Sequence, residues 1–174
     1  MHIQGSNVHL DRNRNHAWVN GAGLLQLPVD KDLDGKPLKT PQILDIWWKD
    51  EMTFDGKSAK FLGDVLTSLE HSRMRCPEME VLLTERISFA DVDRDDRDAD
   101  DNPKVDVNFM ICKGGVDIES REYVEQQPVQ IRRSHFRNLT LNKATGKQLA
   151  NGPGWITVWR KAEGNRAGLS SIAT

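Results

Sequence analysis

The chain has 174 residues, enough for one domain or one elongated repeat array. Hydrophobic residues make up 37% and aromatic residues 6%, whereas charged residues reach 29%, which is a lean core for a compact globule. The net charge of −2 argues against general nucleic-acid binding, and no run approaches the roughly 20 apolar residues of a membrane-spanning helix. Composition therefore favours a thin, strand-built protein.

The N-terminal segment has the pattern of two strands joined by a polar turn. Val8 and Leu10 alternate with polar residues, and this period of two is typical of a strand. Residues 11–15 form the polar turn, after which Ala17 and Val19 alternate again. We expect a hairpin here.

Two glycines interrupt the apolar pattern of the return strand. Gly21 and Gly23 permit positive φ or a bulge, so the chain can bend before residues 24–27 resume as a strand. Pro37 and Pro41 predict a loop between this unit and the next.

A second unit follows the same plan. Met52 and Phe54 alternate as a strand, Asp55-Gly56 is a strong hairpin-turn signal, and Ala59 and Phe61 begin the return. The apolar spacing of residues 61–69 fits both an amphipathic helix and a strand. Gly63 disfavours the helix by about 1 kcal/mol, and we predict a strand.

The remaining chain divides by composition. Residues 1–90 and 104–162 are predicted as β-repeat regions, separated by an acidic loop at 91–103 and followed by a flexible tail at 163–174. From Asp91 to Asp101 there are seven Asp against two Arg. Further strand candidates are residues 43–48, 79–83, 105–112, 116–120 and 129–133.

The two ends of the chain resemble each other. A shift of 131 residues places residues 7–29 on residues 138–160 without a gap, and Gly21 then falls on Gly152. A shift of 42 places residues 17–21 on 59–63. The chain is therefore predicted to be all-β, an elongated open stack of antiparallel strand pairs with repeats.

Motifs for catalysis and for cofactors are missing from the sequence. There is no GxSxG, no P-loop and no paired histidine spacing, and we predict no catalytic residue, no cofactor and no metal site. Asp91, Asp93 and Asp95 resemble the start of a calcium loop, but Asp96 replaces the required glycine. Cys76 and Cys112 are either two buried thiols or one disulfide.

Residues 52–83, MTFDGKSAKFLGDVLTSLEHSRMRCPEMEVLL, resemble the repeat of the OstA/LptA-like periplasmic lipopolysaccharide-transport family. Residues 3–27 resemble a second copy, and residues 105–158 resemble the family more loosely. The resemblance implies an open β-jelly-roll that holds lipid acyl chains in an apolar groove and joins other protomers edge to edge. It also implies a periplasmic location, although no export signal is visible at Met1.

Ligand-binding residues follow from this resemblance. The matching apolar positions would line the groove, or serve simply as core; they are Val8, Leu10, Val19, Leu24, Phe54, Phe61, Val65 and Val81. Residues 130–166 carry eight Lys or Arg against one Glu, and Arg132 and Arg133 of this basic segment would meet lipid phosphates.

Three functions remain open on the sequence. The first is a non-catalytic module of the cell envelope that binds lipopolysaccharide or a similar lipid and either transports it or forms a bridge for it. The second is a structural β-repeat scaffold that joins protein partners, or copies of itself, through strand edges. The third is a carbohydrate-binding module that uses Trp47-Trp48 or the pair Trp155 and Trp159, which share a strand face.

Overall fold

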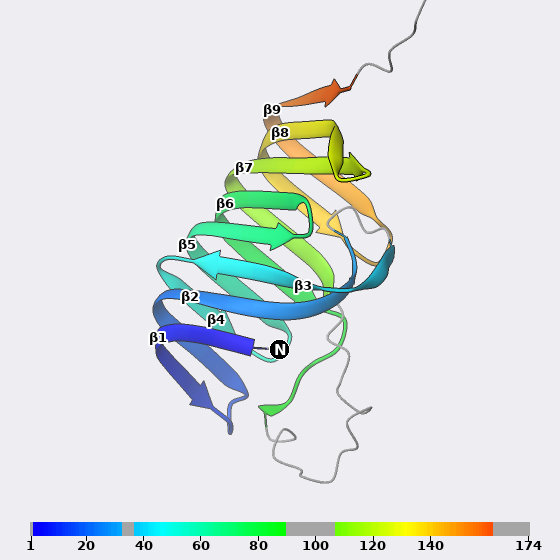
Figure 1. Cartoon of the computed structure of the whole chain (residues 1–174). Helices are drawn as coiled ribbons and strands as arrows, with labels where there is room; N and C mark the ends of the chain where they lie inside the picture. The colour runs from blue at the N-terminus through cyan, green and yellow to red at the C-terminus, as the bar shows by residue number, and fades with distance from the viewer. Residues whose placement is uncertain (1, 33–36, 90–106, 162–174) are drawn as a thin grey trace, which may run out of the picture.

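The computed structural model describes residues 2–32, 37–89 and 107–161, and strands dominate all three segments. These residues form nine strands of one antiparallel sheet, which confirms the all-β prediction (Figure 1). The strands are β1 (His2–Asp11), β2 (His16–Lys31), β3 (Pro37–Trp48), β4 (Glu51–Phe54), β5 (Ser58–Leu69), β6 (Ser72–Leu83), β7 (Val107–Val124), β8 (Gln127–Asn142) and β9 (Lys147–Arg160).

The sheet bends along its length into two arms whose inner faces pack together (Figure 1). The strand order is β1-β2-β3-β5-β6-β7-β8-β9, and β4 lies between β2 and β5. We define the arms by the register on either side of the bends. Arm 1 comprises residues 2–5, 23–31, 37–48, 65–76, 116–136 and 154–160, and arm 2 comprises 7–20, 51–62, 78–83, 107–113 and 138–151.

The bends are bulges that alternate from strand to strand. Two residues on one strand oppose a single residue on its neighbour, and this mismatch turns the sheet. The two-residue bends are Gly21-Ala22, Gly63-Asp64, Gly114-Gly115 and Gly152-Pro153, and the one-residue bends are Ser6, Pro77 and Arg137. Each two-residue bend begins with a glycine at φ between 82° and 91°, a region that side chains disfavour.

The third place in the stack is filled by β3 and β4 together. The two strands are separated by a bend at Lys49 and Asp50, which lies beside the bend of β5. The Lys49 amide donates to the Gly63 carbonyl at 2.7 Å, and the Gly21 amide donates to the Asp50 carbonyl at 2.6 Å. This turn therefore has the same position as the bends of the other strands. With β3 in arm 1 and β4 in arm 2, each arm contains eight strand segments among the described residues.

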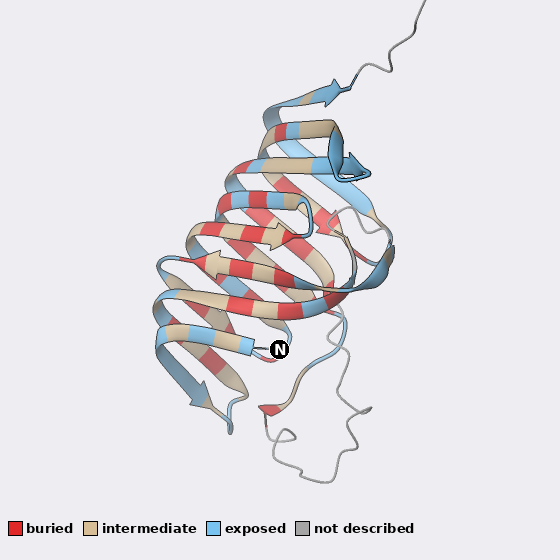
Figure 2. Cartoon of the chain, viewed as in Figure 1, coloured by how far each residue is buried: buried red, intermediate tan, exposed pale blue. Residues whose placement is uncertain are grey.

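The core lies between the arms. Buried residues alternate with less buried ones along the strands, as the banding in Figure 2 shows. Nearly all of the buried residues are apolar. Trp48 and Phe61 are the largest fully buried side chains, and their ring centroids lie 5.3 Å apart. The indole nitrogen of Trp48 donates to the Gly21 carbonyl at 3.0 Å, so the largest core residue also holds a bend.

The strand prediction for residues 61–69 is confirmed, because they lie in β5. Ala59, Phe61, Val65 and Leu69 all face the core, because the two-residue bend at Gly63-Asp64 leaves the alternation unchanged. The described parts of the other strand candidates also lie in strands.

The predicted loop at Pro37 and Pro41 is wrong, because β3 already begins at Pro37. β3 pairs with β5 only over residues 45–47, so its first half has one free edge among the described residues. A proline lacks the N–H that a ladder needs, and a strand with a free edge tolerates it.

The repeat between the two ends is confirmed. Asn7 pairs with Asn20 in the first hairpin, and Asn138 pairs with Asn151 at the equivalent place of the last. The acidic stretch 91–103, with its calcium-loop resemblance, and the tail 163–174 lie outside the described residues. On either side of that stretch β6 and β7 are neighbours, so both predicted repeat regions contribute to one sheet.

Cys76 and Cys112 are buried free thiols, one of the two expected states. The Cys112 sulfur lies 3.7 Å from the Met74 sulfur. The neighbouring Cys76 thiol, together with burial, raises the pKa of Cys112.

Candidate functional site

An apolar row crosses the inner face of arm 1 from one end of the sheet to the other. Directly opposed residues of neighbouring strands share a face, so the register defines the row. We call it the inner strip; it consists of Ile3, Leu25, Ile46, Thr67, Met74, Ile118, Ser134 and Ile156. Parallel rows on either side carry further inner-face residues.

The middle of the inner face is packed core. Five of the predicted groove residues lie there with at most 4% of their surface exposed: Val19, Phe54, Phe61, Val65 and Val81. A small apolar hollow between Ile3, Phe54 and Val81 has a volume of about 20 Å³. That is close to the least that one water needs, so this region holds no acyl chain in the structure shown.

Val8 and Leu10 continue the inner face to the N-terminal end. They oppose Val19 and Ala17, which are buried, and so they share the inner face. Both are about half exposed, 52% and 49%, because β1 pairs only with β2 among the described residues.

Leu24 lies on the opposite face from the other predicted apolar residues. Leu25 is buried in the core, and Leu24 precedes it by one residue, so it points outward beside Trp47. Sequence reasoning placed Leu24 in the groove because it is one of the apolar positions that match the OstA-like repeat. The register decides that only Leu25 faces inward.

The C-terminal end of the inner face is open as well. Ile156 and Val158 oppose Ser134 and Arg132, and they are 60% and 45% exposed. Neither was predicted as a site residue. Their alternation with Trp155 and Thr157 was the available signal, since it marks one apolar face of β9.

The two predicted arginines are on different faces. Arg132 opposes Val158 on the inner face, where the nearby Arg160 donates its Nε to Gln130 Oε1 at 2.6 Å. Arg133 points outward, where its Nε donates to Glu119 Oε2 at 2.6 Å and its guanidinium lies 5.5 Å from the centroid of the Trp159 ring. Only Arg132 therefore belongs to the inner face.

Ion pairs on the outer face lower the pKa values of two carboxylates there. Hydrogen bonds from Arg121 and Arg133 lower the pKa of Glu119. Hydrogen bonds from Arg75 and Lys49 lower the pKa of Asp64, which is shared between them.

No protein-family model and no curated protein matches this chain. The likeness to the OstA/LptA-like family therefore stays a prediction. Within residues 2–32, 37–89 and 107–161 no three His, Cys, Asp or Glu side chains gather as metal ligands would. The same residues include no helix of the length and apolarity that crossing a bilayer requires.

Proposed function

We propose that the chain is a non-catalytic module of the cell envelope that binds and bridges a lipopolysaccharide-like lipid. The observation that carries the proposal is the inner face itself. It is mostly apolar across the sheet, with Thr67 and Ser134 as polar members, and at the C-terminal end it becomes exposed at Ile156 and Val158 beside Arg132.

An amphiphile fits this end by its chemistry. Acyl chains gain about 0.8 kcal/mol per buried CH₂, and Ile156 and Val158 offer apolar surface that the protein leaves uncovered. Arginines form strong charge-assisted hydrogen bonds with phosphates, and Arg132 and Arg160 share this face. The resemblance to the OstA/LptA-like family supports the same ligand and a periplasmic location.

The test is binding of a fluorescent lipid A analogue to two matched variants. Ile156→Asp places a charge on the inner face, whereas Thr157→Asp places the same charge on the outer face one residue away. We expect saturable binding by the wild type and by Thr157→Asp, and its loss in Ile156→Asp. No saturable binding by the wild type contradicts the lipid role. Phe61 is unsuitable as a probe, because it is fully buried and a charge there unfolds the protein.

A second function, assembly through strand edges, is favoured by the pattern of bends. Among the described residues β1 and β9 each have one unpaired edge, and such edges are templates for another chain. β9 has a two-residue bend and β1 a one-residue bend, so β1 of a second copy placed beside β9 continues the alternation. It also continues the antiparallel order of the stack.

Such a contact joins different surfaces on the two copies, so repeated contacts build a ring or an open filament and do not stop at a two-fold dimer. Light scattering over a concentration series is expected to show an average mass that rises without a plateau at the dimer. A constant monomer mass at every concentration contradicts self-assembly.

A further inference from the structure

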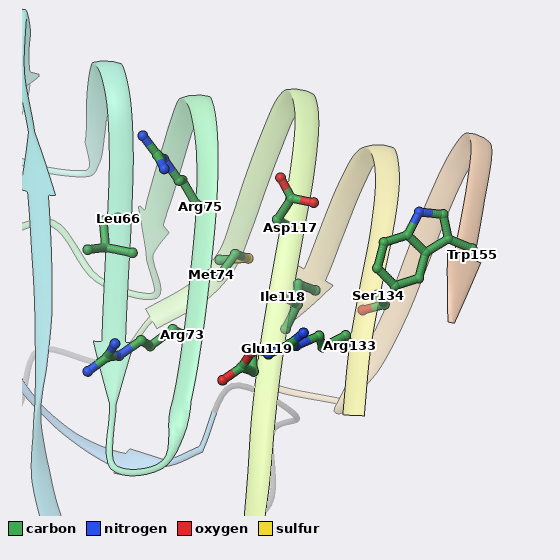
Figure 3. Close-up of a pocket in the computed structure, with 10 residues that line it drawn as sticks. All are labelled: Leu66, Arg73, Met74, Arg75, Asp117, Ile118, Glu119, Arg133, Ser134 and Trp155. Atoms are coloured by element: carbon green, nitrogen blue, oxygen red, sulfur yellow. Dashed lines mark hydrogen bonds and ion pairs between the residues drawn. The ribbon is translucent and has the colours of Figure 1, made fainter. Parts of the chain in front are cut away.

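A hollow lies on the outer face of arm 1, opposite to the inner strip. It has a volume of about 210 Å³ and crosses strands β5 to β9 (Figure 3). We call it the outer hollow; the side chains that matter for its chemistry are Leu66, Arg73, Asp117, Glu119, Arg133 and Trp155.

Strand register gathers these side chains from distant parts of the sequence. One row runs across the strands from Arg75 through Asp117 and His135 to Trp155. The next row, two residues along each strand, runs from Arg73 through Glu119 to Arg133. The two rows share the outer face because side chains two apart on a strand point the same way.

Trp155 forms an aromatic wall at one end of the outer hollow. Its side chain is 51% exposed, and the His135 ring stacks near it with 6.3 Å between centroids and 20° between planes. This stacking fixes the indole while one broad apolar surface stays open to a ligand.

The charges of the outer hollow are mostly paired. Glu119 accepts hydrogen bonds from Arg133 at 2.6 Å and pairs with Arg121 at 2.7 Å, and Asp117 lies 2.8 Å from the His135 ring. Arg73 differs, because it makes no ion pair with any residue that the structure describes. The outer hollow therefore combines two carboxylates that can accept hydrogen bonds, an aromatic wall and the Arg73 guanidinium, which has no ion-pair partner among the described residues.

We propose that the outer hollow binds a single pyranose ring that carries one anionic group. The C–H face of the ring stacks on the Trp155 indole, and the ring hydroxyls donate to the Asp117 and Glu119 carboxylates. The Arg73 guanidinium meets the anionic substituent by charge-assisted hydrogen bonds. The volume is below the roughly 300–1000 Å³ typical of drug-sized pockets, so one small ring fits better than an extended ligand.

Met74, Ile118 and Ser134 of the inner strip also line the hollow. The site still goes beyond the lipid role, because its lining does not include Arg132, Ile156 or Val158, the residues that carry the lipid proposal. Failure of lipid A binding therefore leaves this proposal intact, and the reverse also holds.

Calorimetric titration of the full chain tests it with three probes: glucuronate, glucose 6-phosphate and glucose. We expect saturable binding of at least one anionic sugar, with glucose about tenfold weaker. Whether the carboxylate or the phosphate binds more tightly identifies the anionic group that Arg73 prefers. No saturable heat with any of the three overturns the proposal.

Matched variants separate the two parts of the site. Trp155→Ala is expected to abolish binding, whereas Trp18→Ala, on the outer face of arm 2, keeps it. Arg73→Gln is expected to remove the preference for the anionic sugar, whereas Lys60→Gln, also on arm 2, keeps that preference. Equal binding by Trp155→Ala and Trp18→Ala overturns the stacking role, and an unchanged preference in Arg73→Gln overturns the role of the cation. Far-ultraviolet circular dichroism confirms that each variant is folded.

Discussion

The hairpins at the two ends of the sheet share a backbone but differ in their surroundings. In β1–β2 and in β8–β9 a four-residue turn joins the strands, and its last residue has positive φ, Asn15 at 53° and Gly146 at 68°. In both, the residue before the turn caps it. Asp11 Oδ1 accepts from the Arg14 amide and Asn142 Oδ1 from the Thr145 amide, each at 3.0 Å.

The difference lies in what covers each hairpin. Asn15 is tied to the segment after β6, since its Nδ2 donates to the Ile87 carbonyl and its Oδ1 accepts from the Phe89 amide, both at 2.7 Å. Phe89 then packs edge-on against Phe54 with 5.6 Å between centroids. At the other end Ala150, which occupies the place of the buried Val19, is exposed. The turn of the C-terminal hairpin is tied as well, since the buried Lys143 donates hydrogen bonds to the Asp32 and Asn108 carbonyls. The uncovered part of this end is therefore the strand β9, and we place ligand binding there.

We expect the largest difference in stability loss between a substitution in the packed middle of the sheet and one at its open C-terminal end. Phe61→Ala removes a fully buried ring and should lower the free energy of unfolding by about 3–5 kcal/mol. Ile156→Ala removes an exposed side chain and should change it by no more than about 0.5 kcal/mol. Urea denaturation measures both, and comparable losses would show that the C-terminal end is covered.

The next largest loss of stability is expected from substitutions at the glycine bends. Gly152→Ala forces a side chain into φ of 85° and brings its Cβ to 2.5 Å from Arg137 Cβ, whereas Gly21→Ala meets nothing nearer than 3.9 Å at φ of 91°. The φ cost alone is about 1–3 kcal/mol at each site, and we expect the larger loss at Gly152. Thermal unfolding compares them, and the opposite order would contradict the bend geometry.

Anchoring by Asn15 should be worth less. Asn15→Gly keeps the positive φ but removes both side-chain hydrogen bonds to residues 87 and 89, a loss of about 2 kcal/mol. Asn142→Ala removes the single bond to Thr145 and should cost about 1 kcal/mol. Hydrogen exchange of the β1–β2 amides should rise in Asn15→Gly alone, and a rise in neither variant would show that the anchor is unimportant.

The smallest effect concerns pH. The pKa of Glu119 is lowered from its ordinary value of 4.5 by Arg121 and Arg133, so folding favours the ionised carboxylate. The stabilisation is present above pH 4.5 and is lost as the pH falls through the lowered pKa. The pair is solvent-exposed, so the effect is small. Glu119→Gln should flatten this part of the pH dependence of the urea midpoint between pH 6 and pH 3, and an unchanged slope would show that the pair contributes nothing.

Much of the fold was predictable because strand signals are local. The alternation around Val8 and Leu10 and the glycines at 21, 63 and 152 are visible in the sequence, and they mark the strands and bends that the structure contains. Pro37 and Pro41 led to the wrong prediction of a loop. A free strand edge tolerates proline, but whether an edge is free depends on the neighbouring strands and cannot be read from the local sequence.

The candidate site was less predictable because it depends on register. Leu24 against Leu25, and Arg132 against Arg133, differ by one position, and one position changes the face. The outer hollow combines Arg73, Glu119 and Trp155 from three strands, and no sequence spacing relates them.

Hydrogen exchange with and without a lipid A analogue locates lipid binding on the sheet. We expect slower exchange on lipid addition in residues 154–160, with residues 7–20 unchanged. Equal protection at both ends, or no protection at either, would contradict a lipid site at the open C-terminal end.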